Sequence, residues 1–163
     1  MKKFKLTSEF IVDISGVKLF RIKALIEFGN VKAGDLGGYI EKEENLSHMG
    51  NAWVSGNAQV SGDAQVFGDA RVFGNAWVSG DAWVSGNAQV SGDKDYAYAH
   101  GFGSCNRTTT FFRLKDGDVG VRCGCFYGTL AQFRDNVCET HGETKKAQEY
   151  LMLADLMDFR FKN

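Results

Sequence analysis

The sequence has no proline among its 163 residues, and it has few histidines (three) and few cysteines (four). A chain without proline keeps all its backbone amides available for hydrogen-bonded ladders, but it must turn by other means. Glycine, with 20 residues, supplies those turns, because it adopts left-handed backbone angles without a steric penalty. These totals favour a β-rich chain that turns at glycine.

An excess of charge of either sign is also missing, since 19 basic residues stand against 20 acidic ones and the formal net charge is −1. This balance argues against a protein that binds nucleic acid mainly by electrostatics, and equally against an acidic mimic of DNA. No apolar run has the length of a signal peptide, and none approaches the roughly 20 residues that span a bilayer. We therefore expect a soluble, cytoplasmic protein that binds neither membrane nor nucleic acid.

The cysteines do not form a metal-binding motif. Cys123 and Cys125 are separated by one residue rather than the two usual in zinc knuckles, and Cys105 and Cys138 do not form a second pair at a matching distance. We expect these four side chains to be small, reduced and half-buried. The sequence predicts no metal site and no cofactor.

The sequence does contain, in abundance, a hexapeptide, A-x-V-[SF]-G-[ND], which occurs seven times without insertion from Ala52 to Asp93. Ala and Val lie two residues apart and so point to one side of a strand, whereas x and the Ser or Phe point to the other. Gly and Asn or Asp suit the corner that follows. A coil in which each strand pairs with its equivalent one turn later buries every valine, and short repeats of this kind are typical of β-solenoids.

The hexads resemble the repeat of left-handed β-helices, in which an aliphatic residue is followed four positions later by a small one. In that family three hexads form a triangular coil of 18 residues, so the resemblance implies a left-handed prism. The pattern extends backwards in the same register through residues 34–39, 40–45 and 46–51. Residues 34–93 would then form a little over three coils, with residues 18 apart stacked on one another.

Both ends of a solenoid need caps, because the terminal coils expose apolar side chains and unpaired strand edges. Residues 1–33 predict a β-hairpin cap that turns at Ser15-Gly16. Residues 94–163 predict a ββαα module, with a second hairpin turn at Asp116-Gly117. The expected fold is mainly β with C-terminal α, built from a hairpin cap, the solenoid of residues 34–93 and the ββαα module.

Two helices are expected in the C-terminal module. The first begins after Thr129 as N-cap and ends at Gly142, and the second covers residues 144–159. The second helix is amphipathic, with an apolar surface formed by Ala147, Tyr150, Leu151, Ala154 and either Met157 or Asp158.

The overall layout resembles proteins encoded in bacteriophages and prophages, generally of unassigned role. The resemblance lies in the head LFRIKALIEFGNVKAGDLGGYIEKEENLSH, the hexads, and tail motifs such as RCGCFYGTLAQF. It covers most of the chain but transfers no active-site residue. It implies a protein of the host-cell cytoplasm that binds and inhibits a host protein, including bacterial defence machinery such as the targets of anti-CRISPR inhibitors.

The hexads differ from one another mainly at outward positions, where large side chains interrupt the small ones. With a period of 18, three faces carry such residues: Trp53, Arg71 and Phe73 on the first, Trp77 on the second, and Phe67 and Trp83 on the third. These candidate binding residues are covered by the caps, buried in a homo-oligomer, or offered to a foreign partner. Trp53, directly above Arg71 in this register, is placed for a cation–π contact.

Catalysis is the weaker hypothesis. Hexapeptide-repeat acyltransferases resemble the solenoid and typically use a histidine, but here His48 is expected inside the first coil in a capping role, and His141 at a helix end. His100, in a loop-like stretch after the last hexad, is the alternative catalytic base. The lack of threonine in the hexads excludes a regular ice-binding face, and no lysine-serine signature follows the glycines. We expect a non-enzymatic interaction protein, with an acyltransferase-like or small-ligand-binding protein as the alternative.

Overall fold

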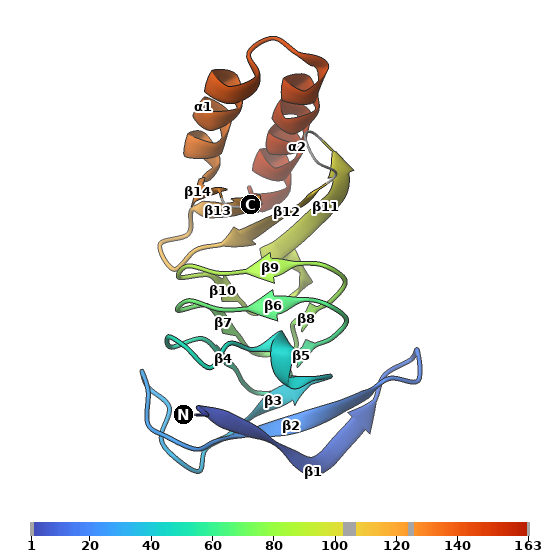
Figure 1. The fold of residues 1–163 in the computed structure, drawn as a ribbon, viewed down its shortest axis with the longest axis vertical. Helices are drawn as coiled ribbons and strands as arrows, with labels where there is room; N and C mark the ends of the chain where they lie inside the picture. The colour runs from blue at the N-terminus through green and yellow to red at the C-terminus, as the bar shows by residue number, and fades with distance from the viewer. Residues whose placement is uncertain (1, 103–106, 124–125, 163) are drawn as a thin grey trace.

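The computed structural model of the chain describes residues 2–102, 107–123 and 126–162. Figure 1 shows an elongated molecule in which an N-terminal hairpin, a stack of short parallel strands, an antiparallel sheet and two helices follow one another along the long axis. The expected class, mainly β with two C-terminal helices and a small central solenoid, is confirmed. In the described part of the chain, neither helix is long and apolar enough to cross a membrane.

The N-terminal cap is a hairpin that continues into the solenoid. Strands β1 (Phe4–Val12) and β2 (Lys18–Ala24) pair antiparallel, and Gly16, with φ 86°, lies in the turn between them, as predicted. Strand β3 (Leu36–Ile40) pairs antiparallel with β2 on one side and parallel with β5 on the other. One sheet, in the order β1-β2-β3-β5-β8, therefore joins the hairpin to the coils.

Each hexad contributes a two-residue strand at its x-Val positions. These strands are β4 (Trp53–Val54), β5 (Gln59–Val60), β6 (Gln65–Val66), β7 (Arg71–Val72), β8 (Trp77–Val78), β9 (Trp83–Val84) and β10 (Gln89–Val90). They form three parallel ladders, β4-β7-β10, β5-β8 and β6-β9, so equivalent residues are 18 apart. The valines of all seven strands are fully buried. The predicted period and inward valine row are confirmed, whereas the left-handed winding stays a prediction of the resemblance.

Glycine is required at the corners for two reasons. Gly62 has φ 65°, a backbone conformation that residues with a Cβ rarely adopt, and a Cβ there would lie 3.2 Å from the backbone of Gly80 in the next coil. Stacked corners therefore pack backbone against backbone.

The backward extension of the repeat is correct in kind but shifted in register. Ile40 pairs with Val60 and Leu46 with Val66, in each case 20 residues apart instead of 18. The segment between Leu46 and Ala52 therefore holds two residues more than a hexad. Leu46 takes the inward valine position, and the prediction that His48 occupies it is wrong.

Two cap side chains satisfy carbonyl groups at the outer edge of the first coil. The Lys3 ammonium donates to the carbonyls of Ala52 at 2.7 Å and Gly50 at 3.3 Å. The Asn45 amide donates to the carbonyls of Ala64 at 2.9 Å and Gly62 at 3.1 Å. No earlier coil supplies amides to these groups, so the two side chains replace it.

The C-terminal module has two more strands than predicted. Its elements are β11 (Tyr96–Phe102), β12 (Arg107–Arg113), β13 (Val119–Cys123), β14 (Phe126–Thr129), α1 (Leu130–His141) and α2 (Lys145–Phe161). The strands form one antiparallel sheet in chain order, which makes the module ββββαα. The stretch expected as a loop is β11, because its alternating Tyr and Ala side chains suit a strand on a half-covered sheet.

The predicted boundaries of α1 and the predicted start of α2 agree with the structure, whereas α2 ends at Phe161, two residues later than predicted. The Thr129 hydroxyl accepts a hydrogen bond from the Gln132 amide at the start of α1, and Gly142, with φ 60°, follows its last residue. In α2, Met157 is buried instead of Asp158. Buried side chains of α1, α2 and the sheet, Met157 among them, form a core separate from that of the coils.

The C-terminal sheet caps the last coil. The Trp83 amide donates to the Thr110 hydroxyl at 2.9 Å, and the Tyr96 hydroxyl donates to the Trp77 carbonyl at 2.6 Å. Leu114 forms an isolated bridge with Ala88. Side chains thus accept or supply hydrogen bonds that a further coil would otherwise provide.

Candidate interaction surface

The first face does not offer Trp53 to a partner. The hairpin cap covers this side chain, which is 4% exposed and meets the Phe28 ring edge-on at 5.3 Å. Of the three alternatives for the outward aromatic residues, coverage by a cap therefore holds for Trp53, and Trp53 is removed from the candidate binding residues. The predicted stack with Arg71 is not among the cation–π contacts of the described residues, although the two residues pair in register as predicted.

Other predicted residues are only half-exposed. Arg71 and Phe73 remain on the first face with intermediate exposure. On the second face the Trp77 indole N–H donates to the Ser61 hydroxyl at 3.3 Å, and this residue also carries the carbonyl that binds Tyr96. Trp77 therefore serves the contact between solenoid and cap.

The third face brings Phe67 and Trp83 together. Phe67 follows β6 and Trp83 begins β9 in the next coil, so the two rings meet edge to face with centroids 6.1 Å apart. Trp83 is 37% exposed, whereas Trp53 is buried and Trp77 is half-buried. The pair forms an aromatic feature on a backbone held by ladder hydrogen bonds.

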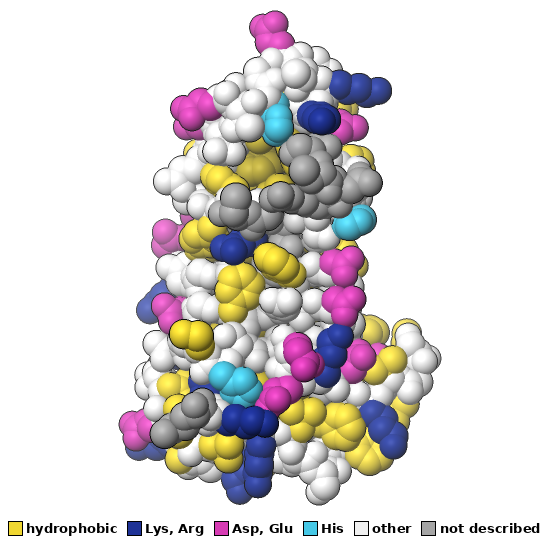
Figure 2. Space-filling view, in the orientation of Figure 1, with side chains coloured by type: hydrophobic (Ala, Val, Ile, Leu, Met, Phe, Trp, Pro, Cys, Tyr) yellow, Lys and Arg dark blue, Asp and Glu magenta, His cyan; other side chains and the backbone are white. Residues whose placement is uncertain are grey.

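The sequence reasoning missed Arg122, which completes this feature. Arg122 lies on β13, and its guanidinium carbon is 5.2 Å from the centroid of the Phe67 ring and 5.9 Å from that of the Trp83 ring. Its Nε is buried and has no hydrogen-bond acceptor among the described residues. We call Phe67, Trp83 and Arg122 the aromatic ridge. Figure 2 shows hydrophobic side chains over the middle coils of this face with a basic side chain beside them.

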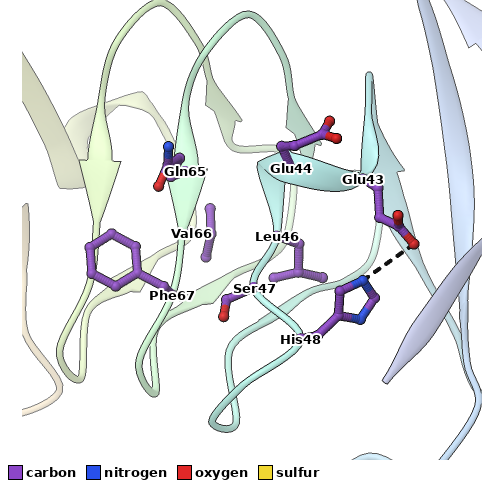
Figure 3. Close-up of a pocket in the computed structure, with 8 residues that line it drawn as sticks. All are labelled: Glu43, Glu44, Leu46, Ser47, His48, Gln65, Val66 and Phe67. Atoms are coloured by element: carbon purple, nitrogen blue, oxygen red, sulfur yellow. Dashed lines mark ion pairs between the residues drawn. The ribbon is translucent and has the colours of Figure 1, made fainter. Parts of the chain in front are cut away.

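A pocket adjoins the ridge on the side of the hairpin (Figure 3). Its volume is about 420 Å³, and it is lined by Glu43, Glu44, Leu46, Ser47, His48, Gln65, Val66 and Phe67. We call it the hairpin pocket. Glu43 and Glu44 of the 3₁₀ turn η1 (Glu43–Asn45) supply its acidic wall, and Phe67 supplies an aromatic side, whereas the Leu46 and Val66 side chains are buried in the solenoid core. Phe67 belongs to both the pocket and the ridge.

His48 holds the hairpin on the first coil. Its Nδ1 accepts a hydrogen bond from the Lys3 amide at 3.1 Å, and its ring stacks on Phe4 with centroids 4.2 Å apart. A ring nitrogen that accepts carries no proton, so the proton of the neutral ring lies on Nε2. Nε2 is 3.3 Å from the Glu43 carboxylate, a contact without hydrogen-bond geometry. Both nitrogens are engaged, in keeping with the expected capping role.

The pKa of Glu43 is lowered from its ordinary value. The hydrogen bond from the Lys2 ammonium is the largest cause, and the Lys2 charge acts in the same direction. The Lys2 nitrogen lies 3.0 Å from Glu43. The carboxylate at the mouth of the pocket is therefore ionised at neutral pH.

The other predicted reactive residues lie apart from this surface. His100 is exposed on the edge strand β11, with Nδ1 2.8 Å from the Thr108 hydroxyl, and His141 lies in the last turn of α1. Cys123 and Cys138 are free thiols, while Cys105 and Cys125 fall outside the described residues. Within the described ranges, no three His, Cys, Asp or Glu side chains are grouped closely enough to hold a metal ion.

Comparison with known proteins supports the solenoid alone. The family described as YdcK Beta solenoid repeat matches residues 64–80, which contain the strands β6, β7 and β8. No curated protein matches the chain. The chain is thus similar, over these three strands, to a β-solenoid repeat.

Proposed function

We propose that this chain is a non-enzymatic binding protein that holds another protein against the aromatic ridge and the hairpin pocket. The partner we propose is a bacterial host protein, and the effect of binding is inhibition. The resemblance to bacteriophage and prophage proteins motivates the choice of partner. The geometry of the third face motivates the choice of surface.

The observation that carries this proposal is the aromatic ridge, in which Trp83 is 37% exposed and the Arg122 guanidinium lies beside the Phe67 and Trp83 rings. Aromatic and arginine side chains are also the residues that contribute most to binding at interfaces. Trp83 and Phe67 supply the aromatic rings and Arg122 supplies the guanidinium on one rigid surface.

The chemistry of the surface suggests what the partner brings. A carboxylate would pair with the Arg122 guanidinium beside two aromatic rings. A basic side chain would enter the hairpin pocket, where it would meet the ionised Glu43 next to Phe67. We therefore propose a partner segment that carries an acidic residue and a basic residue separated by about 5 Å, the spacing of one coil.

Site-specific photo-crosslinking tests the surface directly. A benzophenone side chain at position 83 should capture the partner from host extract, whereas the same group at Gln59, an outward position on the second face, should not. With the captured protein purified, Trp83→Ala and Arg122→Glu should each weaken binding by tenfold or more, as expected for interface anchors. Equal affinity of both variants and wild type would remove the third face from the interaction.

Self-association is a competing occupant of the same ridge, and we propose oligomerisation only as a secondary property. Light scattering distinguishes the two, because a homo-oligomer built on the ridge would lose mass in the Trp83→Ala variant without any other protein. The acyltransferase alternative predicts a different pattern, in which His100→Ala alone abolishes function. The exposed position of His100 on an edge strand gives a substrate little shelter from water.

A further inference from the structure

A second hollow lies where the solenoid, the C-terminal sheet and the end of α2 meet. Its volume is about 610 Å³, and it is lined by Lys94, Asp95, Arg113, Arg160 and Lys162. These residues come from the 3₁₀ turn η2 (Asp93–Asp95), from the end of β12 and from the last residues of the chain. Four of the five are basic, so the hollow has an excess of positive charge.

The single acidic residue is already used within the fold. Asp95 accepts hydrogen bonds from the Ser91 amide at 2.9 Å, from the Ser91 hydroxyl at 2.8 Å and from Arg113 Nε at 3.0 Å. Burial alone would raise the pKa of Asp95, but these hydrogen bonds lower it. Arg113 in turn donates to the Phe161 carbonyl at 3.3 Å. Asp95 and Arg113 therefore compensate each other as a structural pair.

Of the other three cations, Lys94 and Lys162 face solvent, whereas Arg160 is held by contacts within the fold. Lys94 is exposed, and Lys162 is 72% exposed and only 3.7 Å from Asp158, a weak surface contact. Basic groups near the C-terminus of a helix also complement its dipole, which accounts for Arg160 in the last turn of α2. The dipole does not account for Lys94, which comes from η2 on the solenoid side.

An aromatic hollow of about 210 Å³ adjoins the basic one and is lined by Tyr96, Ala97, Tyr98 and Arg160. Arg160 is common to both, and its guanidinium donates to the Tyr96 carbonyl at 3.5 Å. The Tyr96 hydroxyl is fixed on the Trp77 carbonyl, and the Tyr98 ring is 40% exposed. The aromatic wall is thus rigid, partly open and directly beside the positive charge.

We propose that the two hollows form one binding site for a nucleotide, with its phosphates among Lys94, Arg160 and Lys162 and its base against Tyr98. Phosphate oxygens match guanidinium and ammonium donors, and a base has a flat face that stacks on an aromatic ring. Arg160 lies at the junction, where the sugar-phosphate link would pass. The site shares no lining residue with the aromatic ridge, so nucleotide binding can be tested independently of the proposed protein partner.

Isothermal titration with three probes tests both halves of the site. ADP should bind roughly tenfold more tightly than pyrophosphate, because only ADP also stacks on Tyr98, and adenosine should bind more weakly than either. Lys94→Ala combined with Lys162→Ala should weaken ADP and pyrophosphate alike. Tyr98→Ala should lower ADP affinity to that of pyrophosphate while leaving pyrophosphate unchanged, and Tyr98→Phe should retain ADP binding.

The control is Lys145→Ala with Lys146→Ala, which removes the same charge from the other end of α2. Equal affinities for ADP and pyrophosphate in the wild type would overturn the role of Tyr98, and equal losses in the control double variant would overturn the role of the basic hollow. Absence of ADP binding at millimolar concentration would overturn the proposal as a whole. Tighter binding of a ten-residue oligothymidylate than of ADP would replace a free nucleotide by a single strand as the ligand.

Discussion

Lys3 makes the stability of the first coil depend on pH in an unusual direction. Its side chain is 1% exposed, and desolvation lowers its pKa from 10.5 to about 8, against a smaller opposing effect of the Asp69 charge. The ammonium lies 4.6 Å from the centroid of the Phe28 ring and donates to two carbonyls of the first coil. Lys3 is thus a buried charge that is hydrogen-bonded but has no carboxylate in contact among the described residues.

The sign of the pH effect follows from the two pKa values. Between pH 8 and about pH 10.4 the folded chain has released the Lys3 proton, whereas the unfolded chain still holds it. The unfolded state then binds more protons, so the free energy of unfolding rises with pH in this window. At about 1.4 kcal/mol for each unit of pKa difference, the gain between pH 7 and pH 10 is about 2 to 3 kcal/mol.

Urea unfolding of the wild type and Lys3→Met, measured from pH 7 to pH 10, isolates this contribution. The difference in unfolding free energy should shift in favour of the wild type as pH rises. At all pH values the variant also leaves the Ala52 and Gly50 carbonyls without a donor, at about 1 to 3 kcal/mol each. Lys5→Met, which removes an exposed lysine two residues away, is the matched control. A pH-independent difference between wild type and Lys3→Met would refute the reasoning.

Three further predictions concern the same framework. Val72→Asp should unfold the solenoid, because it buries a carboxylate at a fully buried position at a cost of several kcal/mol; a cooperative thermal transition at the wild-type temperature would contradict the inward valine row. Asn45→Ala should lower the free energy of unfolding in urea by about 1 to 3 kcal/mol for each of the two first-coil carbonyls that lose their donor, whereas Glu44→Ala next to it should have little effect. The ionised Asp95 stabilises the wild type above the ordinary aspartate pKa, and this contribution is lost as pH falls through the lowered folded-state pKa, so Asp95→Asn should reduce the free energy of unfolding at pH 6 more than at pH 2.5. An equal difference in unfolding free energy between the two proteins at both pH values would exclude this role.

The solenoid could be predicted from the sequence because its information is local. Ala and Val recur at a spacing that only one strand face can bury, and the corner residues recur with them. The register error before Ala52 arose because LSHMGN satisfies the hexad pattern in composition while His48 is in fact held by Lys3 and Glu43 outside the coil. Two extra residues leave no trace in a pattern that tolerates several residue types.

The caps and the candidate surface depend on contacts between residues distant in sequence. Arg122 reaches Phe67 from a strand 55 positions later, and Lys3 reaches Ala52 across 49 positions. Nothing in the neighbourhood of either basic residue distinguishes it from an ordinary surface charge. The burial of Trp53 likewise follows from where the hairpin folds back, which depends on β3 joining the sheet of β5.

The hydrogen bonds of the hairpin cap reach the first coil and those of the C-terminal sheet reach the last coils, so the number of coils sets the distance between the two caps. Each additional 18-residue coil would add one strand spacing, about 4.8 Å, without altering the hydrogen bonds at either end. The hairpin pocket lies at the N-terminal end of the solenoid, and Arg122 is fixed to the C-terminal end. Phe67 and Trp83 come from adjacent coils, and Arg122 contacts both rings from the C-terminal end. A chain with one coil more or fewer would therefore keep both caps but change the distance between the hairpin pocket and Arg122.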